Sequence, residues 1–238
     1  MSAFLYGVAL QWKLDIRSKS LLITCYVVPL LFFAVMGGIF TSINPEAKYT
    51  LIQSMTVLGV STGALMGLPP SLVEIYASDI KKVYKANGVP LYLGLVSMFL
   101  SAFIHLLIMC VIIYLVAPIA FDATPPVSLP LYFGSLAIFT AVSLSIGSIL
   151  GLAVKSQAKL TMISQVIFLP SIMLSGIMFP VDLLPRIFEI VGKIFPATWG
   201  YKLLAGDVFY FGNLWPLVAI LLAAAILCGF MLKRLQSE

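Results

Sequence analysis

Few side chains in this 238-residue sequence could do chemistry. It has a single histidine, His105, and no HExxH pattern or acidic cluster that could hold a metal. Ser143 and Ser145 lie in SLSIGS, which lacks the glycine frame of a nucleophile elbow. Gly192-Lys193 is followed by isoleucine and lacks the upstream glycine of a phosphate-binding loop. We therefore predict no catalytic residue, no metal site and no cofactor in this chain.

Charged residues instead gather in short stretches between apolar runs, and two of these stretches have a pattern that predicts a helix. The first is SLVEIYASDIKKVYKANGVP, residues 71–90. Its apolar residues recur at helical spacing: Leu72, Tyr76, Ile80 and Val83. This pattern predicts one amphipathic helix of about 13 residues, roughly 20 Å long, over 72–84. The pattern leaves two interpretations open, which are a solvated connector whose lysines fix topology and a docking helix for a cytoplasmic partner.

The second stretch, residues 175–204, is apolar but broken by Pro180, Pro185 and Pro196. Four charges between the breaks are spaced 4, 3 and 4 apart, on one helix stripe: Asp182, Arg186, Glu189 and Lys193. A straight spanning helix would bury them in lipid, at about 2.5–3.5 kcal/mol for each Arg, Lys or Asp. We therefore predict an interfacial or re-entrant helix over 182–194, with Asp182 as its cap and Pro185 in its first turn.

The elements around these stretches are apolar. Hydrophobic residues make up 61% of the chain and charged ones 10%, and runs of about 20 apolar residues recur along it. This composition predicts an all-α membrane protein, one domain over 1–238, with six transmembrane helices at about 20–43, 49–70, 91–117, 131–153, 160–178 and 214–232. An amphipathic interfacial helix is expected over 1–19 and a broken or re-entrant segment over 179–213. Cys25, Cys110 and Cys228 fall inside apolar runs and are expected to be buried small hydrophobes.

The basic residues predict the orientation. With a cytoplasmic N-terminus, ten of the fourteen lie inside: Lys13, Arg17, Lys19, Lys81, Lys82, Lys85, Lys155, Lys159, Lys233 and Arg234. This asymmetry is typical of the positive-inside rule. We predict a multi-pass protein of the inner or plasma membrane with both termini cytoplasmic. The formal charge of +5 thus reflects topology, and we expect no nucleic-acid partner.

The predicted spans are nearly free of acidic residues. Proton- and sodium-coupled carriers usually hold the ion on an intramembrane Asp or Glu, so this argues against such a carrier. We interpret His105 as a polar packing residue. A secondary carrier or an intramembrane enzyme centred on His105 remains an alternative from another class.

These features together resemble the membrane subunit of ABC-2 type ABC transporters. SGIMFPVDLLPRIFEIVGKIFPATW is similar to the S-G-x-x-F-P…L-P…P signature that precedes the family's last span. Residues 74–90 are similar to its coupling helix, although VEIYASDIKKVYK replaces the usual E-x-x-x-G-T-L-E type run. The resemblance implies a permease that exports a drug, antibiotic, peptide or lipid-like compound by alternating access with a separate ATPase. A permease for lipid-linked glycans is the alternative within the family.

The resemblance also implies partners and site residues. The partners are two copies of an ATPase that bind ATP and Mg²⁺, a second, identical permease chain, and membrane lipid. Residues expected to contact the ATPase are Glu74, Tyr76, Asp79, Ile80, Val83, Tyr84 and Lys85. Residues expected at an extracellular gate are Pro180, Asp182, Pro185, Arg186, Glu189 and Pro196. Residues expected along the substrate path are Phe32, Phe33, Met36, Met55, Met66, Phe168 and Met173.

Overall fold

The computed structural model describes residues 3–178, 181–206, 208 and 210–237. Every regular element in these ranges is a helix, which confirms the all-α prediction. In chain order they are α1 (Ala3–Arg17), α2 (Lys19–Leu22), η1 (Ile23–Val27), α3 (Val28–Ile43), η2 (Pro45–Tyr49), α4 (Leu51–Thr62), η3 (Gly63–Gly67), α5 (Leu68–Tyr76), α6 (Ile80–Ala86), α7 (Leu91–Phe121), α8 (Leu129–Ala153), α9 (Gln157–Met173), η4 (Val181–Leu183), α10 (Arg186–Gly192), α11 (Pro196–Leu204) and α12 (Phe211–Ser237).

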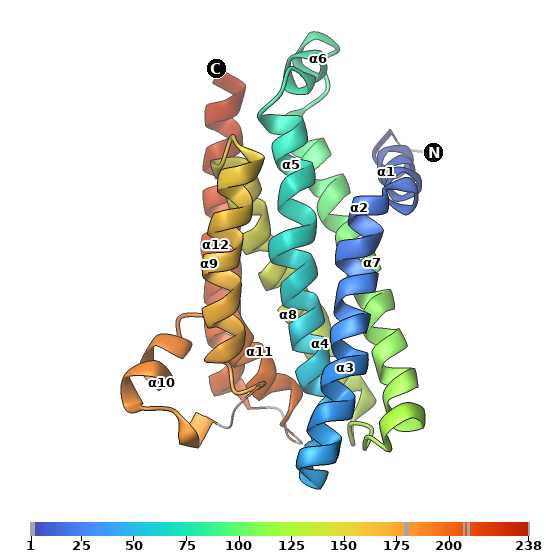
Figure 1. Cartoon of the computed structure of the whole chain (residues 1–238). Coiled ribbons are helices and arrows are strands. Elements are labelled where there is room, and N and C mark those ends of the chain that lie inside the picture. Colours follow the sequence, from blue (N-terminus) through green and yellow to red (C-terminus); the bar gives the residue numbers. More distant parts are fainter. Residues whose placement is uncertain (1–2, 179–180, 207, 209, 238) are drawn as a thin grey trace.

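Five continuous helical stretches of the described chain are long and apolar enough to cross a membrane. They are Ile23–Ile43, Leu51–Tyr76, Leu91–Phe121, Leu129–Ala153 and Phe211–Gln236. The sixth expected span corresponds to α9, which runs along the same long axis (Figure 1). It has 17 residues, so its length is about 26 Å, slightly less than a hydrocarbon core of about 30 Å. The count of six therefore stays a prediction.

The stretch Leu51–Tyr76 is the packing centre of the bundle. In an apolar 18-residue segment of this stretch, 94% of the residues are buried. In the corresponding segments of Ile23–Ile43 and Phe211–Gln236, only 22% are buried. Gly147 of α8 permits the closest approach, since a Cβ there would collide with the Ala64 carbonyl oxygen. Most residues of these two outer helices are thus partly or fully exposed in the single chain, as expected for helices at the edge of a membrane bundle.

The predicted end of the second span near residue 70 was wrong, as was a single amphipathic helix over 72–84. The helix continues through Pro69 and Pro70 to Tyr76, and the π-helical turn Gly63–Gly67 precedes the two prolines. A widened turn is one way a helix accommodates the steric bulk and missing donor of proline. The chain then breaks at Ser78, whose hydroxyl donates to the Glu74 carbonyl (2.6 Å) and accepts from the Ile80 amide (3.2 Å).

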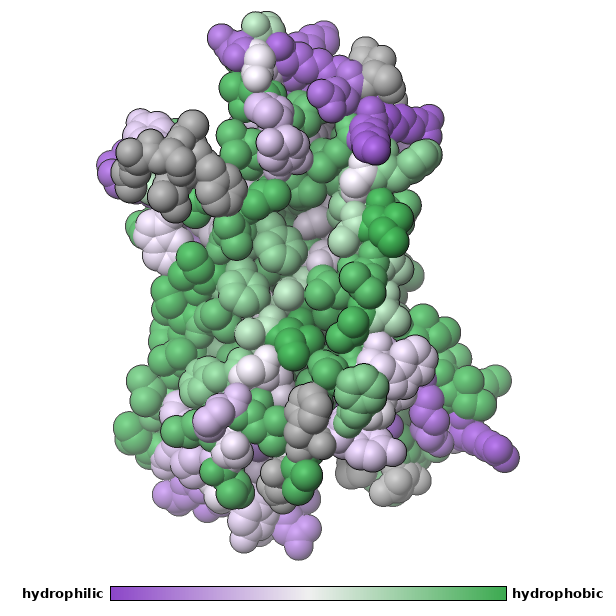
Figure 2. All heavy atoms as spheres, turned by 180° about the vertical axis from the view of Figure 1, so that it is seen from behind, coloured by the Kyte–Doolittle hydropathy of each residue, from purple (hydrophilic) through white to green (hydrophobic). Residues whose placement is uncertain are grey.

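The two ends of the bundle carry different short helices. At one end lie α1, α6, the start of α9 and the end of α12 (Figure 1). At the other end lie η2, α10 and α11. Seen from behind, the middle of the molecule is covered with hydrophobic side chains, and hydrophilic ones gather mainly at the α6 end (Figure 2). Most segments predicted to be cytoplasmic therefore meet at one end. Cys25, Cys110 and Cys228 are buried and free, as expected.

Candidate functional site

Long side chains attach α6, and the end of α5 that leads into it, to the rest of the bundle. Tyr76, at the end of α5, donates a hydrogen bond from its hydroxyl to the Leu91 carbonyl (2.6 Å). The ring of Tyr84 packs where α7 has Gly94, since a Cβ at Gly94 would lie 3.1 Å from Tyr84 Cε2. Lys85 Nζ donates to the Gln236 carbonyl near the end of α12 (3.1 Å). Flexible side chains, rather than close backbone packing, thus join α6 to α7 and α12.

The outer surface of α6 combines apolar and charged side chains. Ile80 and Val83 are 40% and 58% exposed. Beside them, Lys82 Nζ lies 2.7 Å from Asp79 Oδ1. The hydrogen bond and charge of Lys82 lower the pKa of the Asp79 carboxyl, and Asp79 raises the pKa of Lys82 in turn. An apolar centre within a charged rim is the usual anatomy of a protein–protein contact.

Two of the residues expected to contact an ATPase lie elsewhere. Tyr76 is 3% exposed and links α5 to α7, so we leave it out of the proposed contact surface. Glu74 is exposed and lines a cavity of about 280 Å³ between α2, α5 and the start of α9. Met66, expected on the substrate path, lines the same cavity.

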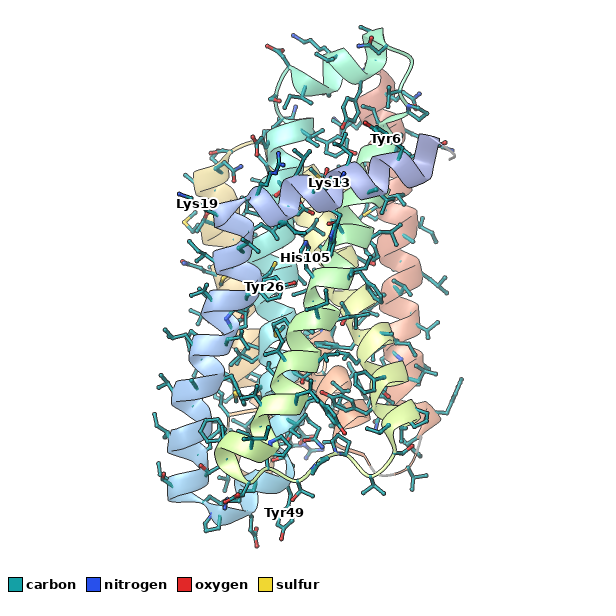
Figure 3. All side chains as sticks on the ribbon, turned by 90° about the vertical axis from the view of Figure 1, so that its right-hand side faces the viewer. Tyr6, Lys13, Lys19, Tyr26, Tyr49 and His105 are labelled. Carbon is teal, nitrogen blue, oxygen red and sulfur yellow. The ribbon has the colours of Figure 1, made fainter. Side chains whose placement is uncertain are left out.

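The N-terminal helix α1 lies across the bundle and packs against α7 (Figure 3). The ring of Trp12 stacks on His105, with centroids 4.1 Å apart and planes 12° from parallel. Tyr26 Oη, from η1, lies at hydrogen-bond distance (2.7 Å) from His105 Nδ1. Asp15 is 5% exposed and accepts a hydrogen bond from the Gln11 amide (2.8 Å). Trp12, Tyr26 and His105 therefore form a joint between three segments that are far apart in sequence.

This joint was not predicted as a unit. His105 was expected to be a packing residue, and its enclosure by Trp12 and Tyr26 fits that interpretation. The available signal was the i, i+3 placement of Trp12 and Asp15 on one face of α1. Among the described residues no three His, Cys, Asp or Glu side chains form a group that could hold a metal.

At the opposite end, the predicted helix over 182–194 was wrong in its start. It begins at Arg186, after Pro185, whose backbone is extended (φ −54°, ψ 141°). Proline disfavours the helical conformation of the residue before it, so Leu184, which follows η4, forms a bend and does not join α10. Asp182 lies in η4, and its side chain, like the whole of Pro180, is outside the described residues. Pro196 begins α11.

The end of α10 is fixed by close contacts to its backbone. Thr198 Oγ1 donates to the Gly192 carbonyl (2.6 Å), and Trp199 Nε1 donates to the Lys193 carbonyl (2.8 Å). A Cβ at Gly192 would lie 2.7 Å from the Leu174 carbonyl oxygen, so only glycine fits this approach to the end of α9.

The charges of α10 lie on its outer side. Lys193 Nζ donates to Glu189 Oε1 (2.8 Å) and thereby lowers the pKa of the Glu189 carboxyl. Arg186 is exposed and lines a shallow polar cavity with Glu189. The gate residues that the structure describes thus cluster at one end of the bundle. Their action as a gate stays a prediction.

The residues expected along the substrate path do not form one surface within this chain. Phe33 and Met55 are 4% and 1% exposed and belong to the core. Phe32 and Met173 are 44% and 50% exposed, on α3 and α9. Met36 and Phe168 are partly buried against the core. A wall for a substrate would therefore need surfaces from more than one chain.

The family model described as ABC-2 type transporter matches residues 3–209, from the start of α1 to just before α12. No curated protein sequence matches the chain. The matched range contains the α1 joint, the α6 surface and the α10–α11 turn.

Proposed function

The chain belongs to the ABC-2 type transporter family, and we propose that it is the permease of an exporter for hydrophobic or amphipathic compounds. Members of this family are membrane subunits of ABC transporters that work with an ABC ATPase and lack a nucleotide site of their own. In our proposal two ATPase copies bind ATP and Mg²⁺ at the cytoplasmic side, and two copies of this chain form the translocation path.

The exposed apolar pair on α6 is the observation that carries this proposal. Ile80 and Val83 lie on a short helix beyond the ends of α5 and α7, at the end of the bundle where most basic segments meet. Burying such side chains in a groove of a partner is favourable, at about 25 cal/mol per Å² of apolar surface. The Asp79–Lys82 pair beside them supplies a polar rim that sets register.

The joint at His105 provides a route from the ATPase side into the spans. Trp12 and Tyr26 connect α1 and the first span to α7, which α6 precedes directly. A push on α6 by a closing pair of ATPases would reach α5 and α7 through Tyr76 and Leu91. The permease would thereby alternate between inward-open and outward-open states, since a ligand shifts such an equilibrium by its preference for one state.

The outer faces of α3 and α9 support pairing of two copies. Apolar side chains on α3 recur every four residues and are exposed: Leu31, Val35, Ile39 and Ile43. Those on α9 recur at 4, 3 and 4: Met162, Val166, Leu169 and Met173. Phe32 and Met173 would face a shared path, and α10 would close it at the outer end.

The test is co-expression of the chain with an ABC ATPase from the same genome, followed by co-purification and measurement of ATP hydrolysis in lipid. Ile80→Glu and Val83→Glu should reduce the amount of bound ATPase at least about tenfold, since each places an unpaired charge in an apolar contact. Membrane insertion and thermal stability should be unchanged, because both positions are exposed.

Val127→Glu is the matched control. Val127 is 84% exposed in the loop between α7 and α8, at the end of the bundle opposite to α6. Full ATPase binding by this variant, with loss in the α6 variants, supports docking at α6. Full binding and normal export in the Ile80 and Val83 variants would refute it.

A further inference from the structure

An apolar groove runs along the outside of the bundle between α7 and α12, with α8 at its floor. Its volume is about 500 Å³, within the range of about 300–1,000 Å³ of sites that bind small molecules. It is lined mainly by Leu95, Phe99, Leu221, Ala225, Gly229 and Leu232. A Cβ added at Gly229 would meet nothing within 4 Å, so the space beside α12 is open.

The length and depth of the groove match one leaflet of a bilayer. The lining residues of α12 extend from Leu221 to Leu232, which is about 16 Å of helix. Half of a hydrocarbon core of about 30 Å is about 15 Å. The groove also begins at the α6 end, where Tyr92 near the start of α7 is 59% exposed. Its long axis therefore follows the direction of an acyl chain in the leaflet on that side.

Positive charge lies at the α6 end of the groove. Lys85 Nζ contacts the carbonyl of Gln236, one turn beyond Leu232, and Lys233 follows Leu232 directly and is exposed. Seen from behind, hydrophobic side chains cover this face and hydrophilic ones gather above it (Figure 2). Basic residues between helices at a membrane surface attract anionic lipid head groups.

We propose that the groove between α7, α8 and α12 is a binding site for one anionic phospholipid of the leaflet at the α6 end. An acyl chain fills the space beside Gly229, Phe99 and Leu95, and the phosphate lies near Lys85 and Lys233. This site is separate from the α3 and α9 surfaces proposed to pair two copies. Bound lipid there would tether the end of α12, and through Lys85 also α6, to the membrane surface.

Lipid binding to the purified full chain tests the proposal. The measurement is the concentration of phosphatidylglycerol that gives half of the maximal thermal stabilisation in detergent, compared with phosphatidylcholine and with inorganic phosphate. Phosphatidylglycerol should bind more tightly than phosphatidylcholine, and inorganic phosphate should have no effect. A phosphate effect equal to that of phosphatidylglycerol would overturn the role of the acyl groove.

Two glycines form a matched pair of variants. Gly229→Leu fills the groove and should weaken phosphatidylglycerol binding about tenfold, the effect of losing nearly two buried methylene groups. Gly134→Leu is the control, because Gly134 is also a helical glycine with nothing within 4 Å of an added Cβ, on α8 outside the groove. Equal lipid binding by the two variants would overturn the proposal.

The head-group contact and the occupant need separate variants. Lys85→Gln together with Lys233→Gln should remove most of the preference for phosphatidylglycerol over phosphatidylcholine and leave phosphatidylcholine binding unchanged. A photoreactive phenylalanine analogue in place of Phe99 should form an adduct with phospholipid in native membranes. An adduct with a second copy of the chain or with another protein would refute lipid as the occupant.

Discussion

Two short helices at opposite ends of the bundle, α6 and α10, are attached to it in different ways. The contacts of α6 are made by side chains that can change rotamer, such as those of Lys85 and Tyr84. The contacts of α10 are made at its own backbone, where Gly192 approaches Leu174 and Thr198 holds the Gly192 carbonyl. Side-chain attachment permits α6 to shift with a partner, whereas backbone attachment makes α10 move only with α9 and α11.

The helix at the centre of the bundle and the helices on its outside also differ, in how fully they are buried. The stretch Leu51–Tyr76 is almost fully enclosed, and packed interiors respond to change by discrete rearrangement. In the apolar segments of Ile23–Ile43 and Phe211–Gln236, only 22% of the residues are buried. A movement of α6 would therefore be carried by the enclosed helix, through Tyr76, while the outer helices adjust to lipid.

A proline in the middle of α10 should have the largest effect. Ile190→Pro removes the donor of a mid-helix hydrogen bond and adds a steric clash, at a cost of about 3 kcal/mol or more. Amide hydrogen exchange should become about a hundredfold faster in α10 and at the start of α11, because their contacts are shared. Exchange in α5 and α6 should stay unchanged, since the other end of the bundle is untouched.

Ile187→Pro is the matched control for this change. Ile187 and Ile190 are similarly exposed, 67% and 57%, but Ile187 lies in the first turn of α10, where proline is tolerated. Equal disturbance by both variants would mean that α10 is not held as a helix. If Ile190→Pro instead disturbed α6 as well, the two ends would not be independent.

The two close-approach glycines should respond differently to alanine. Gly192→Ala places a Cβ 2.7 Å from a backbone oxygen, so α9 or α10 must shift, at a cost of about 1–3 kcal/mol. Gly94→Ala places a Cβ 3.1 Å from the end of the Tyr84 ring, which can move, and alanine gains up to about 1 kcal/mol in a helix interior. Thermal unfolding should therefore show a clear loss for Gly192→Ala and little change for Gly94→Ala.

The opposite ranking would contradict the attachment argument. A large loss in Gly94→Ala would show that Tyr84 is locked in place beside Tyr76 Oη, which would lie 3.2 Å from the added Cβ. In that case α6 would be rigidly bound to α7 and unable to shift alone. The Tyr84→Leu variant in the Gly94→Ala background distinguishes the two cases, since it should restore stability only if the tyrosine ring is locked.

Hydropathy predicted the long apolar helices because a segment in lipid must form all its backbone hydrogen bonds within itself, whichever helices lie beside it. Hydropathy gave wrong helix ends where packing between helices determines how far a helix continues. The helix through Pro69 and Pro70 depends on a π-helical turn that composition does not reveal, and the end of α5 depends on one hydroxyl, that of Ser78. Local propensity alone favours a stop at two prolines, and tertiary burial of Leu72 and Tyr76 overrides it.

The candidate sites show the same division. Exposed residues such as Ile80 and Val83 could be chosen from helical spacing, because an amphipathic pattern marks the face that the bundle leaves open. The joint of Trp12, Tyr26 and His105 could not, since it brings together three segments whose contact depends on how α1 crosses the bundle. Likewise, the groove beside Gly229 is lined by α7, α8 and α12 together, so the pattern of no single helix predicts it.

Of all these changes, removal of the surface ion pairs on α10 and α6 should have the smallest effect on stability. The pKa of Glu189 is lowered by Lys193, so the folded state binds its proton less tightly than the unfolded chain does. The pair therefore stabilises α10 above the unfolded pKa of about 4.3 and loses this contribution as the pH falls through the lower folded value. The thermal unfolding temperature of the Glu189→Gln variant should be slightly below that of the unchanged chain at about pH 7 and equal to it at about pH 3.

Asp79→Asn is the corresponding change on α6. Lys82 lowers the pKa of Asp79 in the same direction, so the sign of the pH dependence is the same. However, the Asp79 and Lys82 side chains are 86% and 73% exposed, against 39% and 42% for Glu189 and Lys193. Solvent screens the more exposed pair more strongly, so at about pH 7 Asp79→Asn should lower the thermal unfolding temperature less than Glu189→Gln does. Salt at about 1 M should remove both effects. A larger effect at Asp79 would place that carboxylate in a contact that fixes α6, and the freedom of α6 to follow an ATPase would have to be abandoned.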